Sequence, residues 1–162
     1  MRRRDRGMGM SGRYLVVTKE LIESIKSGEV SVYDCSVDLD IDKMWQMIQF
    51  TLTGDMVHGE PPLGYVVPMA GEQYIGNYSD MDLFLLTNEQ VLEAYMALEQ
   101  LTPEELKKRF SLEQMVAEGV YPVMDDWDAE ETFQEIVQTL DDVQALYQAT
   151  AASGNGIVFY IF

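Results

Sequence analysis

The sequence contains very little cysteine or histidine. Cys35 and His58 are the single examples of each among its 162 residues. One cysteine cannot form an intrachain disulfide, and it cannot supply the cysteine-rich ligand sets of structural zinc sites. Chains without disulfides are typical of reducing compartments, so we expect a cytoplasmic protein.

Basic residues are also scarce. The chain has 11 Lys and Arg against 28 Asp and Glu, which gives a formal net charge of -17 at pH 7. A surface of that charge repels phosphate backbones and anionic lipids, so we expect no nucleic-acid partner and no membrane partner. The same electrostatic field attracts basic proteins and speeds their association.

Long apolar runs are absent from the sequence. The run Ile157–Phe162 is far shorter than the roughly 20 residues that a transmembrane helix needs. The basic residues at the start precede a stretch rich in Gly and Met instead of the apolar core of a signal peptide. We expect residues 1–7 to be a disordered basic extension or an upstream start, with Met8 as the alternative start, and residues 8–162 to form one domain.

The first half of the chain carries clear start and stop signals. Residues 12–18 favour a strand, and Thr18 is placed to cap a short helix. Apolar residues at helical spacing then predict a second helix that is capped by Asp40 and ends at Gly54. Frequent Gly and Pro residues in 55–82 predict a long ordered loop with one or two brief strands.

The second half is predicted to be mostly helical. A buried strand is expected at 83–86, and four residues have the spacing of helix N-caps: Thr87, Thr102, Ser111 and Asp128. The helix that follows Asp128 has the longest apolar face.

The closing run Ile157–Phe162 has no polar alternation, which indicates a strand buried on both faces. We expect this strand inside the sheet, beside the first strand. The sequence therefore predicts an α+β fold, with a small mixed sheet that includes the N- and C-terminal strands and packs against about five to six helices.

Three motifs together resemble one known family. They are Met8-Gly9-Met10-x-Gly12, Leu39-Asp40-Ile41-Asp42-Lys43-x-Trp45 and Phe50-x-Leu52-Thr53-Gly54. Their order and spacing are similar to those of the bacterial YfbM-like family, domain of unknown function 1877, and the resemblance continues to the end of the chain. It implies an α+β fold and supplies no activity.

One position departs from that family. Its members commonly carry His before the Phe of the second predicted helix, where this chain has Gln49-Phe50. A glutamine side chain cannot act as the same acid, base or metal ligand. A catalytic role of the family histidine is therefore not expected in this chain.

Two loop residues, His58 and Glu60, are candidate site residues. The functional interpretation is that His58 acts as a general acid or base whose pKa Glu60 adjusts, although a lone loop histidine is more often an ordinary surface residue. A Cys35 nucleophile assisted by His58 is a further alternative. It has little support, because Cys35 lacks any family signature of catalytic cysteines and flanks the apolar Val32-Tyr33 pair.

Two acidic clusters stand at predicted helix starts, residues 38–42 and residues 125–128. Carboxylates at such positions cap free N–H groups, and neither cluster has the spacing of a calcium-binding EF-hand loop, so we predict no metal site and no cofactor. In the second cluster, Asp125, Asp126 and Asp128 surround Trp127. An aromatic residue ringed by acids is typical of an interaction hot spot for a basic partner.

Two functional hypotheses remain open. The first is a non-enzymatic, acidic, cytoplasmic binding protein that holds a basic protein partner, as an inhibitor or immunity protein does. The alternative is a small-molecule binder or an enzyme that uses the 58–76 loop. The sequence contains no convincing set of catalytic residues, which favours the first hypothesis.

Overall fold

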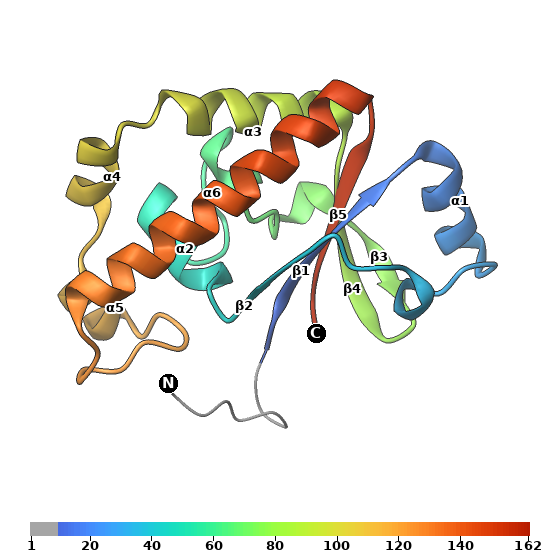
Figure 1. Cartoon of the computed structure of the whole chain (residues 1–162). Helices are drawn as coiled ribbons and strands as arrows, with labels where there is room; N and C mark the ends of the chain where they lie inside the picture. The colour runs from blue at the N-terminus through green and yellow to red at the C-terminus, as the bar shows by residue number, and fades with distance from the viewer. Residues whose placement is uncertain (1–9) are drawn as a thin grey trace.

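The computed structural model describes residues 10–162, and the predicted basic extension at residues 1–7 lies outside this range. Within it, the chain folds into one five-stranded sheet flanked by helices, with strand order β2-β1-β5-β4-β3 (Figure 1). The strands are β1 (Gly12–Val17), β2 (Leu39–Asp42), β3 (Tyr74–Tyr78), β4 (Met81–Leu86) and β5 (Gly156–Ile161). The α+β fold class is therefore confirmed.

Residues 10–162 contain six α-helices, in agreement with the predicted number, and α3 and α6 lie side by side on one face of the sheet (Figure 1). None of these helices is both long and apolar enough to cross a membrane. The helices are α1 (Lys19–Ser27), α2 (Trp45–Thr53), α3 (Asn88–Gln100), α4 (Pro103–Arg109), α5 (Leu112–Glu118) and α6 (Ala129–Ser153).

The C-terminal strand β5 lies at the centre of the sheet, between β1 and β4, as its composition predicts. Phe159 is paired with Tyr14 of β1, and alternate β5 side chains enter two different cores. Phe159 belongs to the larger core, while Val158 and Tyr160 belong to the smaller one. The strand is therefore buried on both faces and joins the two ends of the fold.

The prediction of a mixed sheet is wrong, because all four strand pairings are antiparallel. An unbroken apolar strand is typical of parallel sheets, in which helices cover both faces. Here α1 covers the second face of an antiparallel sheet, and its Ile22 and Ile25 pack with Leu15 and Val17 of β1. The composition of β5 thus reports burial on both faces and does not report strand direction.

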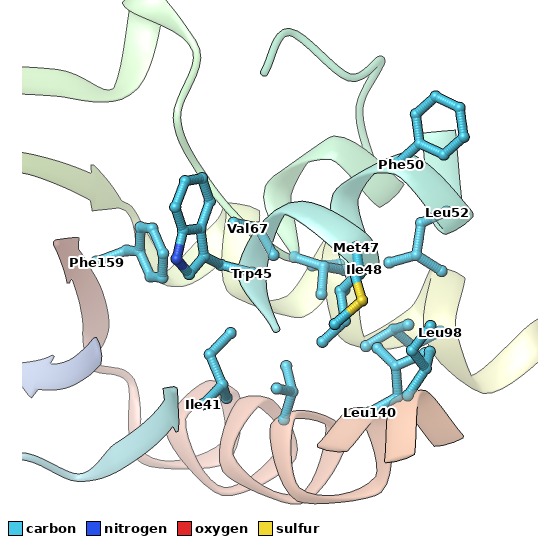
Figure 2. Packing of buried hydrophobic residues seen from close by; sticks show 14 of the residues in the cluster. Ile41, Trp45, Met47, Ile48, Phe50, Leu52, Val67, Leu98, Leu140 and Phe159 are labelled. Carbon is cyan, nitrogen blue, oxygen red and sulfur yellow. The ribbon is translucent and has the colours of Figure 1, made fainter. Parts of the chain in front are cut away.

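The larger core fills the space between the other face of the sheet and the helices α2, α3 and α6. Figure 2 shows Met47 of α2 close to Leu98 of α3 and Leu140 of α6, with Ile41 of β2 pointing into the same region. All four side chains are buried. Burial of an apolar side chain of this size stabilises a fold by about 1.5–3 kcal/mol.

Five predicted helix starts are confirmed. In each, a side-chain oxygen accepts a hydrogen bond from the backbone N–H three residues later, and this satisfies one N–H of the first turn. The capping residues are Thr18, Thr87, Thr102, Ser111 and Asp128. The starts of these five helices can therefore be predicted from the capping side chains alone.

The predicted start of the second helix is wrong. Residues 39–42 form β2, α2 begins at Trp45, and Asp40 caps no helix. The Asp40 Oδ2 atom instead lies 3.1 Å from Nε of Arg13 on β1. Polar and apolar residues alternate with period two through residues 38–42, which is the pattern of a half-buried strand, and pairing with β1 decides between that pattern and the helical spacing.

The segment between α2 and β4 is a loop with short elements, as predicted. It contains single 3-10 turns at Leu63–Tyr65 and Gly71–Gln73, followed by β3. Val66 and Val67 lie between these turns and are completely buried. This part of the loop is therefore built into the larger core, while β4 begins two residues earlier than the predicted strand.

Two buried tyrosines hold this loop. The Tyr14 hydroxyl of β1 donates to the Val66 carbonyl at 2.6 Å, and the Tyr147 hydroxyl of α6 donates to the same carbonyl at 2.9 Å. Tyr147 also lies 3.0 Å from the Tyr65 carbonyl. Burial raises the pKa of both hydroxyl groups above the usual value near 10. The sheet, the longest helix and the loop thus meet at one carbonyl group.

We expect Tyr147→Phe to lower the free energy of unfolding by about 1–3 kcal/mol, because the substitution leaves the half-buried Tyr65 carbonyl without this donor. Urea unfolding monitored by circular dichroism measures this loss. Tyr33→Phe is the matched control, since Tyr33 is 55% exposed, and it should change stability by less than about 0.5 kcal/mol. Equal effects of the two substitutions would contradict the assigned role.

Stability should also fall at alkaline pH. The stabilising contribution of Tyr14 and Tyr147 is fully present below the unfolded-state pKa near 10, and it is lost as the pH rises from there toward the raised folded-state values. Urea unfolding between about pH 8 and 11 tests this dependence. The Tyr14→Phe/Tyr147→Phe double variant should show a smaller fall than the parent, and an unchanged fall would refute the attribution to these two groups.

Candidate functional site

A cleft with a volume of about 460 Å³ opens between β2, the turn that leads into α2, residues 122–127 and α6. We call it the Trp127 cleft. Its lining combines acidic side chains with methionine and other apolar side chains: Leu39, Asp40, Ile41, Asp42, Lys43, Met44, Met47, Pro122, Met124, Trp127, Glu135, Gln138, Thr139 and Asp142. The volume falls within the range of roughly 300–1,000 Å³ that is usual for ligand pockets.

β2 forms the first wall. Ile41 is buried in the core, and Asp40 and Asp42 line the cleft. Asp42 has a φ of 56°, in the left-handed region that Asp and Asn tolerate better than most residues. This conformation ends the strand, and a hydrogen bond of 3.1 Å from the Met44 N–H to the Ile41 carbonyl closes the turn. The wall thus ends in a compact turn that leads directly into α2.

α6 forms the second wall. Glu135, Gln138, Thr139 and Asp142 line the cleft, and their spacing of three, four and seven residues places them on one face of the helix. The buried face of α6 carries apolar residues such as Leu140. Burial of that face fixes the rotation of the helix, so the polar stripe is presented to the cleft.

Residues 122–127 form the third wall and are tied to α2. The Tyr121 N–H donates to Gln46 Oε1 at 2.7 Å, and the Tyr121 ring centroid lies 5.5 Å from that of Trp45. The backbone N–H of Trp127 donates to the Met124 carbonyl at 3.2 Å, and the half-buried Trp127 side chain packs against the larger core. The aromatic residue of the cleft is therefore held by the fold.

The charges in the cleft are mostly negative. β2 contributes Asp40 and Asp42, α6 contributes Glu135 and Asp142, and Lys43 is the cation within the lining. Methionine and aromatic side chains lie between these charges. A cation that carries an apolar stem can meet carboxylates and apolar surface at the same time, so the arrangement suits a basic ligand with a long side chain.

The predicted acidic cluster at 125–128 is divided by the structure. Trp127 lines the cleft, whereas Asp125 and Asp126 are exposed and are not among its lining residues. Asp128 caps α6 by accepting from the Glu131 N–H at 2.8 Å. One aromatic side chain of the predicted cluster thus belongs to the cleft, and one carboxylate has a structural role.

His58 and Glu60 lie elsewhere, in the exposed part of the loop that follows α2. The backbone N–H groups of Val57 and His58 donate to Asp55 Oδ1 at 3.0 and 2.9 Å, and these bonds lower the pKa of the Asp55 carboxyl. A second pocket of about 290 Å³ is formed mainly by the same loop, and neither candidate lines it. Its lining is Gly59, Pro61, Gly64, Tyr65, Ala70, Glu72, Gln73 and Gln90.

Cys35 is not placed for a catalytic pair with His58. Its side chain packs against the smaller core beside α1, and its Sγ lies 3.6 Å from the Ser31 carbonyl. Burial, together with the charges of Asp34 and Asp38, raises the pKa of the thiol. The thiolate, which is the nucleophilic form, is therefore disfavoured.

Gln49, at the position where the family commonly has histidine, is completely buried on α2. Its Nε2 donates to the Val67 carbonyl at 3.0 Å and to the Val57 carbonyl at 3.3 Å. Its Oε1 has no hydrogen-bond partner among the described residues. The side chain links α2 to the loop and does not line the Trp127 cleft.

Metal coordination finds no support in residues 10–162, where no group of three or more His, Cys, Asp or Glu side chains could hold an ion. The carboxylates of the cleft come from separate walls and do not form such a group. What the cleft can do chemically is bind a positively charged group.

Sequence reasoning missed Asp42, Glu135 and Asp142 as site residues. Asp42 was assigned to a helix start, although the period-two pattern of residues 38–42 marks a strand. The four polar residues form a stripe on one face of α6, and such a stripe is normally a solvated helix surface, so their sequence pattern alone does not indicate a site. Only the tertiary fold brings it opposite Trp127 and β2.

Comparison with known proteins identifies the family. The chain is 28% identical over 161 residues to "Protein YfbM" of Escherichia coli (strain K12), a match that covers 91% of this chain and 95% of the relative. Its fold is similar to the crystal structure of a protein of unknown function, YfbM from Escherichia coli, with a TM-score of 0.72, 24% identity and coverage of 96% of this chain and 100% of that one. The family model "Domain of unknown function (DUF1877)" matches residues 8–160. Since this match spans nearly the whole sequence, the chain belongs to the DUF1877 family.

Proposed function

We propose that the chain is a non-enzymatic, cytoplasmic binding protein that holds a basic protein partner in the Trp127 cleft, in the manner of an inhibitor or immunity protein. The observation that carries the proposal is the lining of the cleft, where Trp127 and methionines lie among four carboxylates. Fold and family leave the activity open, so the proposal rests mainly on this site.

The overall charge supports the same kind of partner. A net charge of -17 produces a negative field that extends beyond the cleft and repels nucleic acid. For a basic protein, this field raises the rate of encounter, and complementary charges suppress wrong partners. The cleft then supplies what long-range charge cannot, which is a shaped contact with an aromatic anchor.

The side chains of the cleft favour binding over catalysis. Among residues 10–162, the lining contains no histidine or cysteine, and its one hydroxyl group, that of Thr139, donates to the Glu135 carbonyl at 2.8 Å within α6. Nucleophilic catalysis needs a nucleophile within hydrogen-bond reach of a base, and general acid–base catalysis needs a positioned proton carrier. The Trp127 cleft assembles neither pair.

The alternative, a small-molecule or enzyme site in the 58–76 loop, has weaker support. The pocket formed mainly by this loop, with a volume of about 290 Å³, is smaller than the Trp127 cleft, and Glu72 is the single charged residue among the described residues that line it. His58 and Glu60, the two residues that motivate the alternative, do not line this pocket. We therefore place the function in the Trp127 cleft.

Affinity capture with matched variants tests the proposal. The parent protein should retain a basic protein from native lysate near physiological salt, and the same protein, once purified, should bind the parent directly in a titration. Glu135→Gln/Asp142→Asn removes two charges from the cleft and should abolish capture. Trp127→Ala should weaken the direct affinity by about 2 kcal/mol or more, which is roughly thirtyfold, as expected for a hot-spot residue.

Asp125→Asn/Asp126→Asn is the control for this experiment, because it removes the same number of charges beside Trp127 but outside the cleft lining. It should leave capture nearly unchanged. Two results count against the proposal: binding that survives Glu135→Gln/Asp142→Asn, and failure of the purified parent to bind any basic protein that it captures.

A further inference from the structure

We infer that the group held in the Trp127 cleft is an arginine side chain of the basic partner, an inference that rests on the proposed function. The lining of the cleft includes an indole ring, carboxylates from two different walls and three methionine side chains. Each of these features suits a guanidinium group better than the ammonium group of lysine. Together they define the chemistry of the ligand more narrowly than net charge does.

Trp127 supplies the aromatic surface. Its side chain is half-buried and packs against the larger core. The hydrogen bond from its backbone N–H to the Met124 carbonyl fixes the backbone at this position. Tryptophan attracts cations more strongly than the other aromatic residues do. The planar guanidinium group also stacks on aromatic faces, which a compact ammonium group does not.

The carboxylates come from two elements that the fold brings together. Asp42 lies at the end of β2, and Glu135 and Asp142 lie one above the other on α6. A guanidinium group has five N–H donors in a fixed plane, so it can bond to acids on two walls at the same time. An ammonium group acts as a point charge and gains less from this arrangement.

The methionine side chains of the cleft favour a weakly hydrated cation. Met44, Met47 and Met124 belong to the lining, and methionine adapts its shape to a long aliphatic stem. The guanidinium group is more weakly hydrated than an ammonium group, so moving it against this surface removes less favourable hydration. A volume of about 460 Å³ gives room for a long side chain and its immediate neighbours.

Lys43 adds a positive charge to the lining of the cleft. It is half-buried directly after β2 and is the single cation among the lining residues that the structure describes. Because like charges repel, its ammonium group weakens the field that an incoming arginine meets. Replacement by methionine keeps an unbranched apolar stem and removes the charge, so Lys43→Met should strengthen arginine binding.

Titration with two capped tripeptides tests the inference on the whole protein. One peptide has arginine between two glycines, the other has lysine there, and the side-chain N–H signals of the tryptophans are followed by NMR at low ionic strength. The Trp45 indole, which donates to the Met10 carbonyl at 2.8 Å, is the internal reference. The arginine peptide should shift the Trp127 signal at a concentration on the order of threefold lower than the lysine peptide requires.

Matched variants decide the source of that shift. Glu135→Gln/Asp142→Asn should abolish it, while Glu131→Gln/Asp141→Asn should retain it, because this control removes the same charges from exposed positions of α6 that do not line the cleft. Lys43→Met should lower the concentration that is needed. The thermal melting temperature of each variant confirms that the fold is kept.

Three outcomes would overturn the inference: equal concentrations for the two peptides, a Trp127 shift that survives Glu135→Gln/Asp142→Asn, or no shift with either peptide. If capture of the partner protein still depends on the cleft in any of these cases, only the arginine assignment fails. If capture does not depend on the cleft, the proposed function fails with it.

Discussion

The hydroxyl groups of Tyr14 and Tyr147 donate to the same carbonyl, that of Val66, at 2.6 and 2.9 Å. Tyr14 belongs to β1, which pairs with β2, and Tyr147 belongs to α6. The contact therefore sets α6 relative to the edge of the sheet, and these are the two elements that carry the carboxylates of the Trp127 cleft. Buried polar groups are costly unless they are paired. The arrangement of β1, α6 and the Val66 loop that pairs these hydroxyl groups is therefore preferred over arrangements that leave them unpaired.

The parts of the fold that the sequence predicts well are those decided by local chemistry. Thr87 caps α3 through a side chain three residues from its partner, and β5 is buried because all of its residues are apolar. β2 is not predicted from the sequence, because Asp40 fits two patterns. It precedes apolar residues at helical spacing, and it also lies within the polar–apolar alternation of a strand. Pairing with β1 decides between the two patterns, and that contact is remote in sequence.

The candidate site was predicted only in part, for a related reason. Trp127 was visible because acids surround it in the sequence, whereas its partners in the cleft come from β2 and from the middle of α6. Because these residues are far from Trp127 in the sequence, no local motif indicates that they share a site with it. Gln49 illustrates the opposite case: its position was singled out by resemblance to the family, but the side chain serves as a buried link between α2 and the loop.

The Trp127 cleft is assembled from three segments that are far apart in the chain, so it does not exist in the unfolded protein. A ligand that binds there binds only the folded state and shifts the folding equilibrium toward it by mass action. At a free concentration one hundred times the Kd, the shift amounts to about 2.7 kcal/mol. Since proteases degrade unfolded chains, the steady-state amount of this protein in a cell would follow the abundance of any ligand that binds in the cleft.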